Sequence, residues 1–181
     1  DHVETEWVTF IDPDDFVDKQ YFKVIDDELE KDDSISMIVS NLKFFIEDEN
    51  IIQDRHPLRF RFENTSKKFS SLDLKDFMNL SAAATIFKTN SILKNKIEFN
   101  SNIRPNFEDG KLIVDYLLCD SGEVVFLKNS VYLYRKRSDK SSTVDTSWKN
   151  VQKYNDVLKH GYVAMLESYN IHQPFVATKN S

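Results

Sequence analysis

The side chains best suited to catalysis or metal binding are few and scattered in this sequence of 181 residues. No histidine has metal-ligand spacing to another histidine, to the single cysteine or to a pair of carboxylates on one helix face. The cysteine ends a predicted strand beside a turn, which favours a structural role over that of a nucleophile. We therefore predict no catalytic, cofactor-binding or metal-binding residue and no cofactor. The residues considered are His2, His56, Cys119, His160 and His172.

Carboxylates are too common to identify a site by themselves, because the chain has 30 Asp and Glu residues. Asp12, Asp14 and Asp15 could act as oxygen ligands of a hard cation, but a calcium loop needs a longer ligand series with a central glycine. The run Asp12-Pro13-Asp14-Asp15 is typical of a helix start, with a capping Asp, a proline in the first turn and acids at the positive end of the dipole. We interpret it as a helix cap.

Charge is unevenly distributed along the chain. Residues 1–50 carry sixteen acidic and four basic side chains, whereas residues 51–181 carry fourteen acidic and twenty basic ones. The acidic segment either docks against the basic remainder of the chain or presents an acidic face to a basic partner. For the second case we predict a partner surface that includes Glu28, Glu30, Asp32 and Asp33.

Two short basic segments offer possible contacts to nucleic acid. They are residues 55–62, in which arginine alternates with phenylalanine, and the link 135–140. In a strand this alternation sends the phenylalanines into the core and the arginines to the opposite face, so the rings are not offered to bases. We do not expect nucleic acid to be the main partner. The candidate basic contacts are Arg59, Arg61, Arg135, Lys136 and Arg137.

The last predicted helix starts near Asp145 or Thr146 and carries an apolar stripe at spacings of three and four. Several of its aromatic side chains have a polar atom on an apolar body, which suits an interface as well as a core. We predict either core packing or a docking or homodimer surface. The partner-binding candidates here are Trp148, Tyr154, Tyr162 and Tyr169.

The remaining elements predict an α+β fold in a single domain over residues 1–181, excised from a longer protein. An extended arm (1–11) precedes an N-terminal helix pair, with the second helix over 35–46. A strand (58–62), a helix (from Ser70 or Ser71 to Phe87) and a three-stranded antiparallel meander follow, with a bulge near residues 128–130. The meander strands are 97–103, 111–118 and 123–134, joined at Asp109-Gly110 by a hairpin turn. A frayed tail (172–181) follows the long C-terminal helix.

This layout predicts a curved antiparallel sheet covered by helices. Its element order is similar to that of cone-shaped folds of the nuclear-transport-factor-2-like kind. The resemblance is one of element order alone, so it implies a cone-like sheet and no site residue.

Compartment and class follow from composition. No apolar run reaches the roughly 20 residues that span a bilayer, so we expect no membrane insertion. The single cysteine favours a reducing compartment, and we expect an intracellular location, in the cytoplasm or nucleus.

From these observations we predict a non-catalytic protein–protein interaction or scaffold domain, a regulatory subunit of a larger eukaryotic complex and not an enzyme. An alternative is a ligand-binding or enzymatic pocket between sheet and helices, lined by residues such as Phe99, Tyr116, Phe126 and Tyr132. A second alternative is RNA or single-stranded DNA binding through 55–62 and 135–140.

Overall fold

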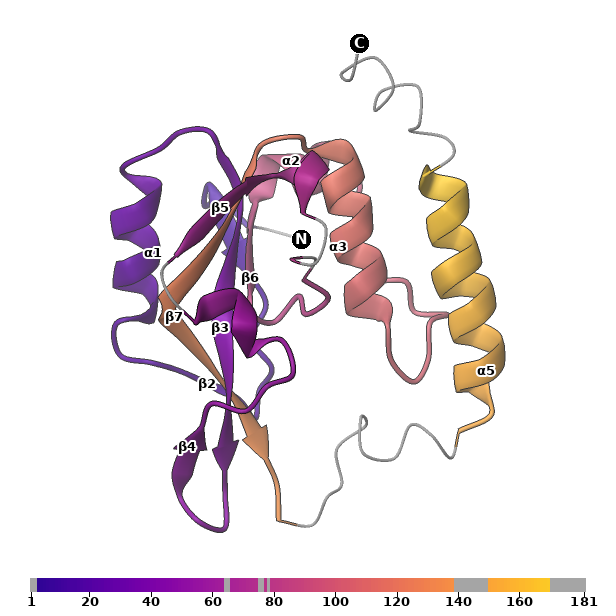
Figure 1. Ribbon diagram of the computed structural model, residues 1–181. Coiled ribbons are helices and arrows are strands. Elements are labelled where there is room, and N and C mark those ends of the chain that lie inside the picture. Colours follow the sequence, from indigo (N-terminus) through magenta and orange to yellow (C-terminus); the bar gives the residue numbers. More distant parts are fainter. Residues whose placement is uncertain (1–2, 64–65, 75–76, 78, 139–149, 170–181) are drawn as a thin grey trace.

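The computed structural model describes residues 3–63, 66–74, 77, 79–138 and 150–169. These residues form a curved, mixed sheet with helices on both faces (Figure 1). The hydrogen-bonded strand order is β1-β6-β3-β7-β2, with β4 added beside β3 and β5 beside β7. The strands are β1 (Trp7–Thr9), β2 (Phe16–Val17), β3 (Ile35–Ile46), β4 (Ile51–Gln53), β5 (Lys67–Ser70), β6 (Thr85–Lys88) and β7 (Glu123–Lys136).

The two longest strands, β3 and β7, run parallel at the centre of the sheet. The first seven residues of β3 are all buried, as expected for a parallel strand covered on both faces. The pairing shifts register after Ser40 and Leu127, so residues 128–130 have no partner in β3, which confirms the predicted bulge.

Helices cover the two faces and separate the core into two layers. On one face α1 (Tyr21–Leu29) packs Tyr21 and Ile25 with Val125 and Leu127. On the other face α3 (Glu108–Cys119) packs beside Val124 and Phe126, the alternate residues of β7. The short helix α2 (Thr89–Lys94) follows β6 directly.

The C-terminal helix lies beside α3 (Figure 1). It consists of α5 (Gln152–Asp156) and a π-helical segment, η5 (Val157–Val163), and it continues to residue 169. Two short 3-10 turns, η1 (Arg59–Phe62) and η2 (Ser71–Asp73), complete the described elements.

The predicted α+β class, curved sheet, strand 123–134 and C-terminal helix are confirmed. The predicted arm over residues 1–11 contains β1, which pairs with β6. The sheet, however, is mixed and not purely antiparallel, because β3 and β7 are parallel. The predicted tail 172–181 lies outside the described residues.

The helix predicted over 35–46 is strand β3, so there is no N-terminal helix pair. A strand that is buried on both faces has apolar residues at every spacing, and some of them match the helical period by accident. The helix predicted from Ser70 or Ser71 to Phe87 is also wrong: it is replaced by η2, loop and strand β6.

The prediction of a three-stranded meander is wrong for its first two strands. Residues 97–103 are irregular, and 111–118 lie in α3, where Leu112, Ile113 and Tyr116 face the core. Asp109-Gly110 therefore opens a helix and does not form a hairpin turn. The predicted strand 58–62 is the tight turn η1, which buries Arg61 and Phe62 together, so the alternation predicted for a strand does not apply.

No helix in the described part of the chain is long and apolar enough to cross a membrane.

Candidate functional site

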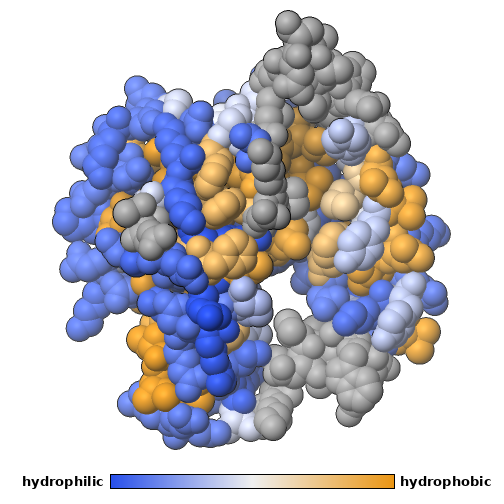
Figure 2. Space-filling model, viewed as in Figure 1, coloured by the Kyte–Doolittle hydropathy of each residue, from blue (hydrophilic) through white to orange (hydrophobic). Residues whose placement is uncertain are grey.

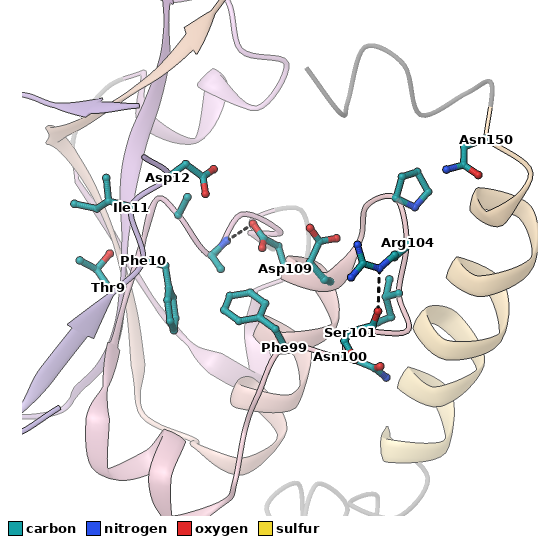
Figure 3. A pocket seen from close by; sticks show the side chains of 15 residues that line it. Thr9, Phe10, Ile11, Asp12, Phe99, Asn100, Ser101, Arg104, Asp109 and Asn150 are labelled. Atoms are coloured by element: carbon teal, nitrogen blue, oxygen red, sulfur yellow. Dashed lines mark hydrogen bonds between the residues drawn. The ribbon is translucent and has the colours of Figure 1, made fainter. Parts of the chain in front are cut away.

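An open hollow of about 800 Å³ lies where the end of β1 meets the start of α3 (Figure 3). Its walls come from four separate parts of the chain, and three of its lining residues are carboxylates: Asp12, Glu108 and Asp109. Phe10 and Phe99 form an apolar side, with ring centroids 5.0 Å apart in an edge-to-face arrangement. The lining residues are Thr9–Asp12, Ala82, Ala83, Phe99–Ser101, Ile103–Pro105, Glu108, Asp109 and Asn150.

Asp12 lies three residues after the end of strand β1, in the segment that lines the hollow. Its backbone N–H donates to the Tyr132 hydroxyl over 3.3 Å, which ties the segment after β1 to the centre of the sheet. Partial burial raises the pKa of Asp12 above its ordinary value, and the nearby charges of Asp109 and Asp14 raise it further. Asp12 is therefore the point at which three carboxylates repel one another.

The residues after Asp12 are held in place by β7. Asp15 accepts hydrogen bonds from the Tyr132 hydroxyl at 2.7 Å and from the Arg135 backbone N–H at 2.8 Å. Burial raises the pKa of Asp15, although both hydrogen bonds act in the opposite direction. Asp14 pairs with Arg137, with 2.5 Å between Oδ2 and Nη2. The helix cap predicted for residues 12–15 is replaced by this set of contacts, because β2 follows at Phe16.

Asp109 enters the hollow from the first turn of α3. Its Oδ2 accepts the Ala82 backbone N–H at 2.9 Å. Burial raises the pKa of Asp109, the nearby Glu108 adds to the rise, and the Ala82 hydrogen bond opposes it. Glu108 Oε2 is buried and has no hydrogen-bond partner among the described residues. Asp109 is thus a half-buried carboxylate with a raised pKa, which is suited to accept a proton from a bound hydroxyl group.

Polar and cationic groups lie on the side of the hollow opposite the sheet. Arg104 is exposed, and its Nε donates to the Ser101 carbonyl oxygen at 3.2 Å. Asn100 and Asn150 also line this side, the latter just before the C-terminal helix (Figure 3). The hollow thus combines carboxylates, amides, one guanidinium and aromatic rings, which suits a polar ligand with hydroxyl groups.

The residues predicted to contact a partner lie elsewhere. Glu28 and Glu30 belong to the end of α1 and its cap, Asp32 forms an ion pair with Lys68, and Asp33 lies in the loop before β3. Their role as a partner surface stays a prediction.

The aromatic residues of the C-terminal helix are largely exposed. Tyr154 is 62 % exposed, Tyr162 45 % and Tyr169 44 %, whereas Trp148 lies outside the described residues. Figure 2 shows apolar residues along the visible side of this helix, where Leu158 and Leu166 are exposed. Tyr162 stacks on Phe107, the residue before Glu108.

The predicted basic contacts are divided among several environments. Arg61 is buried and Arg59 exposed, so they do not form one face. Arg135 pairs with Glu47, Arg137 with Asp14, and Lys136 lies over the rings of Phe44 and Tyr134. Residues 139 and 140 of the predicted link lie outside the described residues, and among the described ones these side chains form no continuous basic strand for a nucleic acid.

Of the residues predicted to line a pocket between sheet and helices, only some line this hollow. Phe99 lines the hollow, but Tyr116, Phe126 and Tyr132 are fully buried in the core. The carboxylates were missed as a site because Asp12 resembled a cap and Asp109 a turn residue. No local signal distinguished Asp12 or Asp109 from the other acids, because the chain has 30 Asp and Glu residues. Among the described residues, no three His, Cys, Asp or Glu side chains are grouped so as to hold a metal ion.

Comparison with known proteins finds one relative by sequence that is named for teichoic acid biosynthesis. This chain is 23% identical over 167 residues to the minor teichoic acid biosynthesis protein GgaA of Bacillus subtilis (strain 168), covering 92% of this chain and 36% of that protein. The chain thus spans about a third of the length of this relative. No family model matches the sequence.

Solved structures of S. aureus TarS have a similar fold. TarS 1-349 in complex with UDP-GlcNAc superimposes with a TM-score of 0.61 at 20% identity, covering 75% of this chain and 36% of that one. TarS 1-349 in complex with UDP gives a TM-score of 0.60 at 19% identity, covering 74% and 37%.

These comparisons contradict the predicted non-catalytic scaffold. The relative is named for teichoic acid biosynthesis, and the TarS neighbours were solved with small molecules, UDP-GlcNAc in one case and UDP in the other. The expected protein partner, regulatory complex and eukaryotic setting are therefore wrong. The alternative, a ligand-binding or enzymatic pocket, agrees better with these findings. We conclude that this chain has the fold of part of TarS.

Proposed function

We propose that this chain supplies part of the active site of a glycosyltransferase that uses a UDP-activated sugar in the synthesis of a teichoic-acid-type polymer. The observation that carries the proposal is the hollow that Asp12 and Asp109 both line, within a fold like that of TarS solved with UDP-GlcNAc. Because the chain spans about a third of its relative, other parts of the polypeptide would complete the substrate site.

Asp109 is the candidate general base. In the transfer, an acceptor hydroxyl oxygen bonds to the anomeric carbon, the bond from that carbon to the diphosphate oxygen breaks, and UDP leaves. The hydroxyl proton passes to the Asp109 carboxylate. The Ala82 N–H orients this carboxylate, and its raised pKa brings it closer to the pH at which proton transfer is efficient.

A divalent cation would offset the charge that the diphosphate brings. The phosphates would enter a hollow whose acids already repel one another, which is unfavourable without positive charge. Mg²⁺ is often held by one or two carboxylates together with substrate phosphates. Asp12, which lies near the negative charge of Asp14, is a carboxylate that could hold such a cation. Since the described residues contain no ready-made metal cluster, we propose that the cation binds together with the nucleotide sugar.

The test of this cation site is calorimetric titration of the intact polypeptide with UDP-GlcNAc, in Mg²⁺ or Mn²⁺ and in EDTA. We expect Asp12→Asn to weaken binding at least tenfold with the cation present and to have little effect in EDTA. Asp27→Asn, an exposed acid of α1, serves as the control. Equal affinity of wild type and Asp12→Asn under both conditions would exclude the proposed cation site.

Measurement of turnover tests the role of Asp109 as the general base. We expect Asp109→Asn to lower kcat by about 10²–10⁴-fold while UDP-GlcNAc still binds. Wild-type turnover in this variant would contradict the role given to Asp109, and absence of both binding and turnover in the wild type would contradict the glycosyltransferase assignment.

A further inference from the structure

The residue that precedes Glu108 and Asp109 has an unusual backbone. Phe107 is the N-cap residue of α3, with φ of 86° and ψ of −1°, in the left-handed region that glycine and asparagine favour. A non-glycine residue held there is strained and persists only where surrounding contacts enforce this conformation. Those contacts should therefore be made by the Phe107 ring.

Two of the chain's three glycines touch that ring. A Cβ atom at Gly110 would lie 2.9 Å from Phe107 Cε2, and one at Gly161 would lie 2.8 Å from Cδ1. Both distances are too short for a real Cβ, so only glycine leaves room for the ring in its present position. Tyr162 stacks on the ring, with a centroid separation of 4.4 Å and an interplanar angle of 28°. We call Gly110, Gly161 and Tyr162 the aromatic clamp.

The clamp joins the C-terminal helix to the hollow. Gly161 and Tyr162 belong to the π-helical segment η5, and such segments often occur at functional sites. Gly110 belongs to the first turn of α3, which also carries the two carboxylates of the hollow. The Phe107 carbonyl oxygen accepts the Lys111 N–H at 3.1 Å, so the orientation of Phe107 sets the start of the helix.

We propose that Phe107, held by the aromatic clamp, is a positioning residue that sets the direction in which Glu108 and Asp109 enter the hollow. This proposal rests on the proposed function for its catalytic meaning. On this proposal the C-terminal helix supports the carboxylates Glu108 and Asp109. Gly161 then affects these carboxylates only through the Phe107 ring.

A double-mutant cycle in the intact polypeptide tests the proposal. Phe107→Gly removes the ring but accepts the positive φ, so the start of α3 keeps a permitted backbone. Gly161→Ala keeps the ring but displaces it. We expect each variant to lower kcat by about 10–100-fold with KM for UDP-GlcNAc nearly unchanged, because a misplaced group affects the transition state more than substrate binding.

The double variant carries the decisive prediction. If Gly161 acts through the ring, Gly161→Ala has no further effect in the Phe107→Gly background. If the double variant instead lowers kcat by the product of the two single reductions, the proposal is overturned. Tyr162→Phe, which keeps the stacked ring, and Leu166→Ala, an exposed change on the same helix, should both resemble the wild type.

A second measurement is independent of turnover. The Ala82 amide donates to Asp109, so its NMR chemical shift should follow the titration of that carboxylate in the wild type. We expect Gly161→Ala and Phe107→Gly to reduce this response strongly while the rest of the amide spectrum stays folded. An unchanged Ala82 response in both variants refutes the positioning role even if the wild type transfers no sugar. A reduced response with an inactive wild type upholds the positioning role and refutes the glycosyltransferase assignment alone.

Discussion

The acidic residues of this protein occupy two contrasting environments. Burial raises the pKa of Asp12, Asp15 and Asp109, which lie in or beside the hollow. Hydrogen bonds from Lys68 and Arg135 lower the pKa of Asp32 and Glu47, respectively, on the surface. Carboxylates that are desolvated without a cationic partner lower stability, and such residues concentrate at functional sites.

Asp109→Asn should therefore stabilise the folded protein at neutral pH. The amide can still accept the Ala82 N–H but has no charge to desolvate, and we expect a gain of about 0.5–1 kcal/mol. A pKa raised by folding means that the wild type recovers this stability on protonation, so the gain should vanish near pH 4. Urea unfolding of both proteins at pH 7 and pH 4 measures it. A variant less stable than wild type at pH 7 contradicts this account.

Among the elements, β7 does most to hold the site in place. It pairs with β3, β2 and β5, and its side chains and backbone reach the acidic segment after β1 through Tyr132 and Arg135. A segment with only one two-residue strand is otherwise poorly restrained. The central strand therefore sets the position of residues 12–15.

Tyr132→Phe tests this role of β7. The change removes the hydrogen bond to Asp15, and the acceptor of the Asp12 N–H, from a fully buried ring and leaves the ring packing in place. Hydrogen bonds to charged groups contribute about 1.5–3 kcal/mol, so we expect a loss of about 2 kcal/mol in chemical unfolding. We also expect turnover to fall about tenfold, as the residues around Asp12 loosen. Unchanged turnover together with lost stability would show that Asp15 is structural only.

On the scale of the whole molecule, the acidic first fifty residues and the basic remainder meet within the fold. Ion pairs join Asp14 to Arg137, Asp32 to Lys68 and Glu47 to Arg135. All three are partly exposed, and water and salt screen such pairs, so each contributes little to stability. The charge asymmetry is therefore partly neutralised inside the chain, with modest effect on stability.

The pH dependence of stability should show two opposite limbs. Carboxylates with a raised pKa favour the folded state once protonated, so stability should rise as pH falls from 7 toward about 4.5. Asp32 and Glu47, carboxylates with a lowered pKa, lose their contribution as pH falls below about 4. Burial lowers the pKa of His56, and this single group opposes the rise as pH falls through the ordinary histidine range. Thermal unfolding across pH 3–8 should therefore show a maximum on the acidic side. A monotonic fall from pH 7 would contradict the first limb.

Local patterns in the sequence predicted the elements in which a single pattern dominates. The strand around Val124–Phe126, its bulge and the C-terminal helix are correct, because long alternating or periodic segments are shaped mainly by their own burial. Strand β3 was missed since burial on both faces removes alternation. The first turn of α3 was missed because Asp-Gly also suits a hairpin, and the choice depends on the packing of Leu112 and Tyr116.

By itself, the sequence determined the α+β class, the charge asymmetry and the absence of a ready-made metal or nucleophile motif. Only the tertiary structure brought Asp12 and Asp109, 97 positions apart in the chain, into one hollow and placed Phe107 against Gly161. The physical reason is that a carboxylate becomes chemically distinct through desolvation and neighbouring charge. Both depend on the surrounding fold and not on the residues beside it in the sequence.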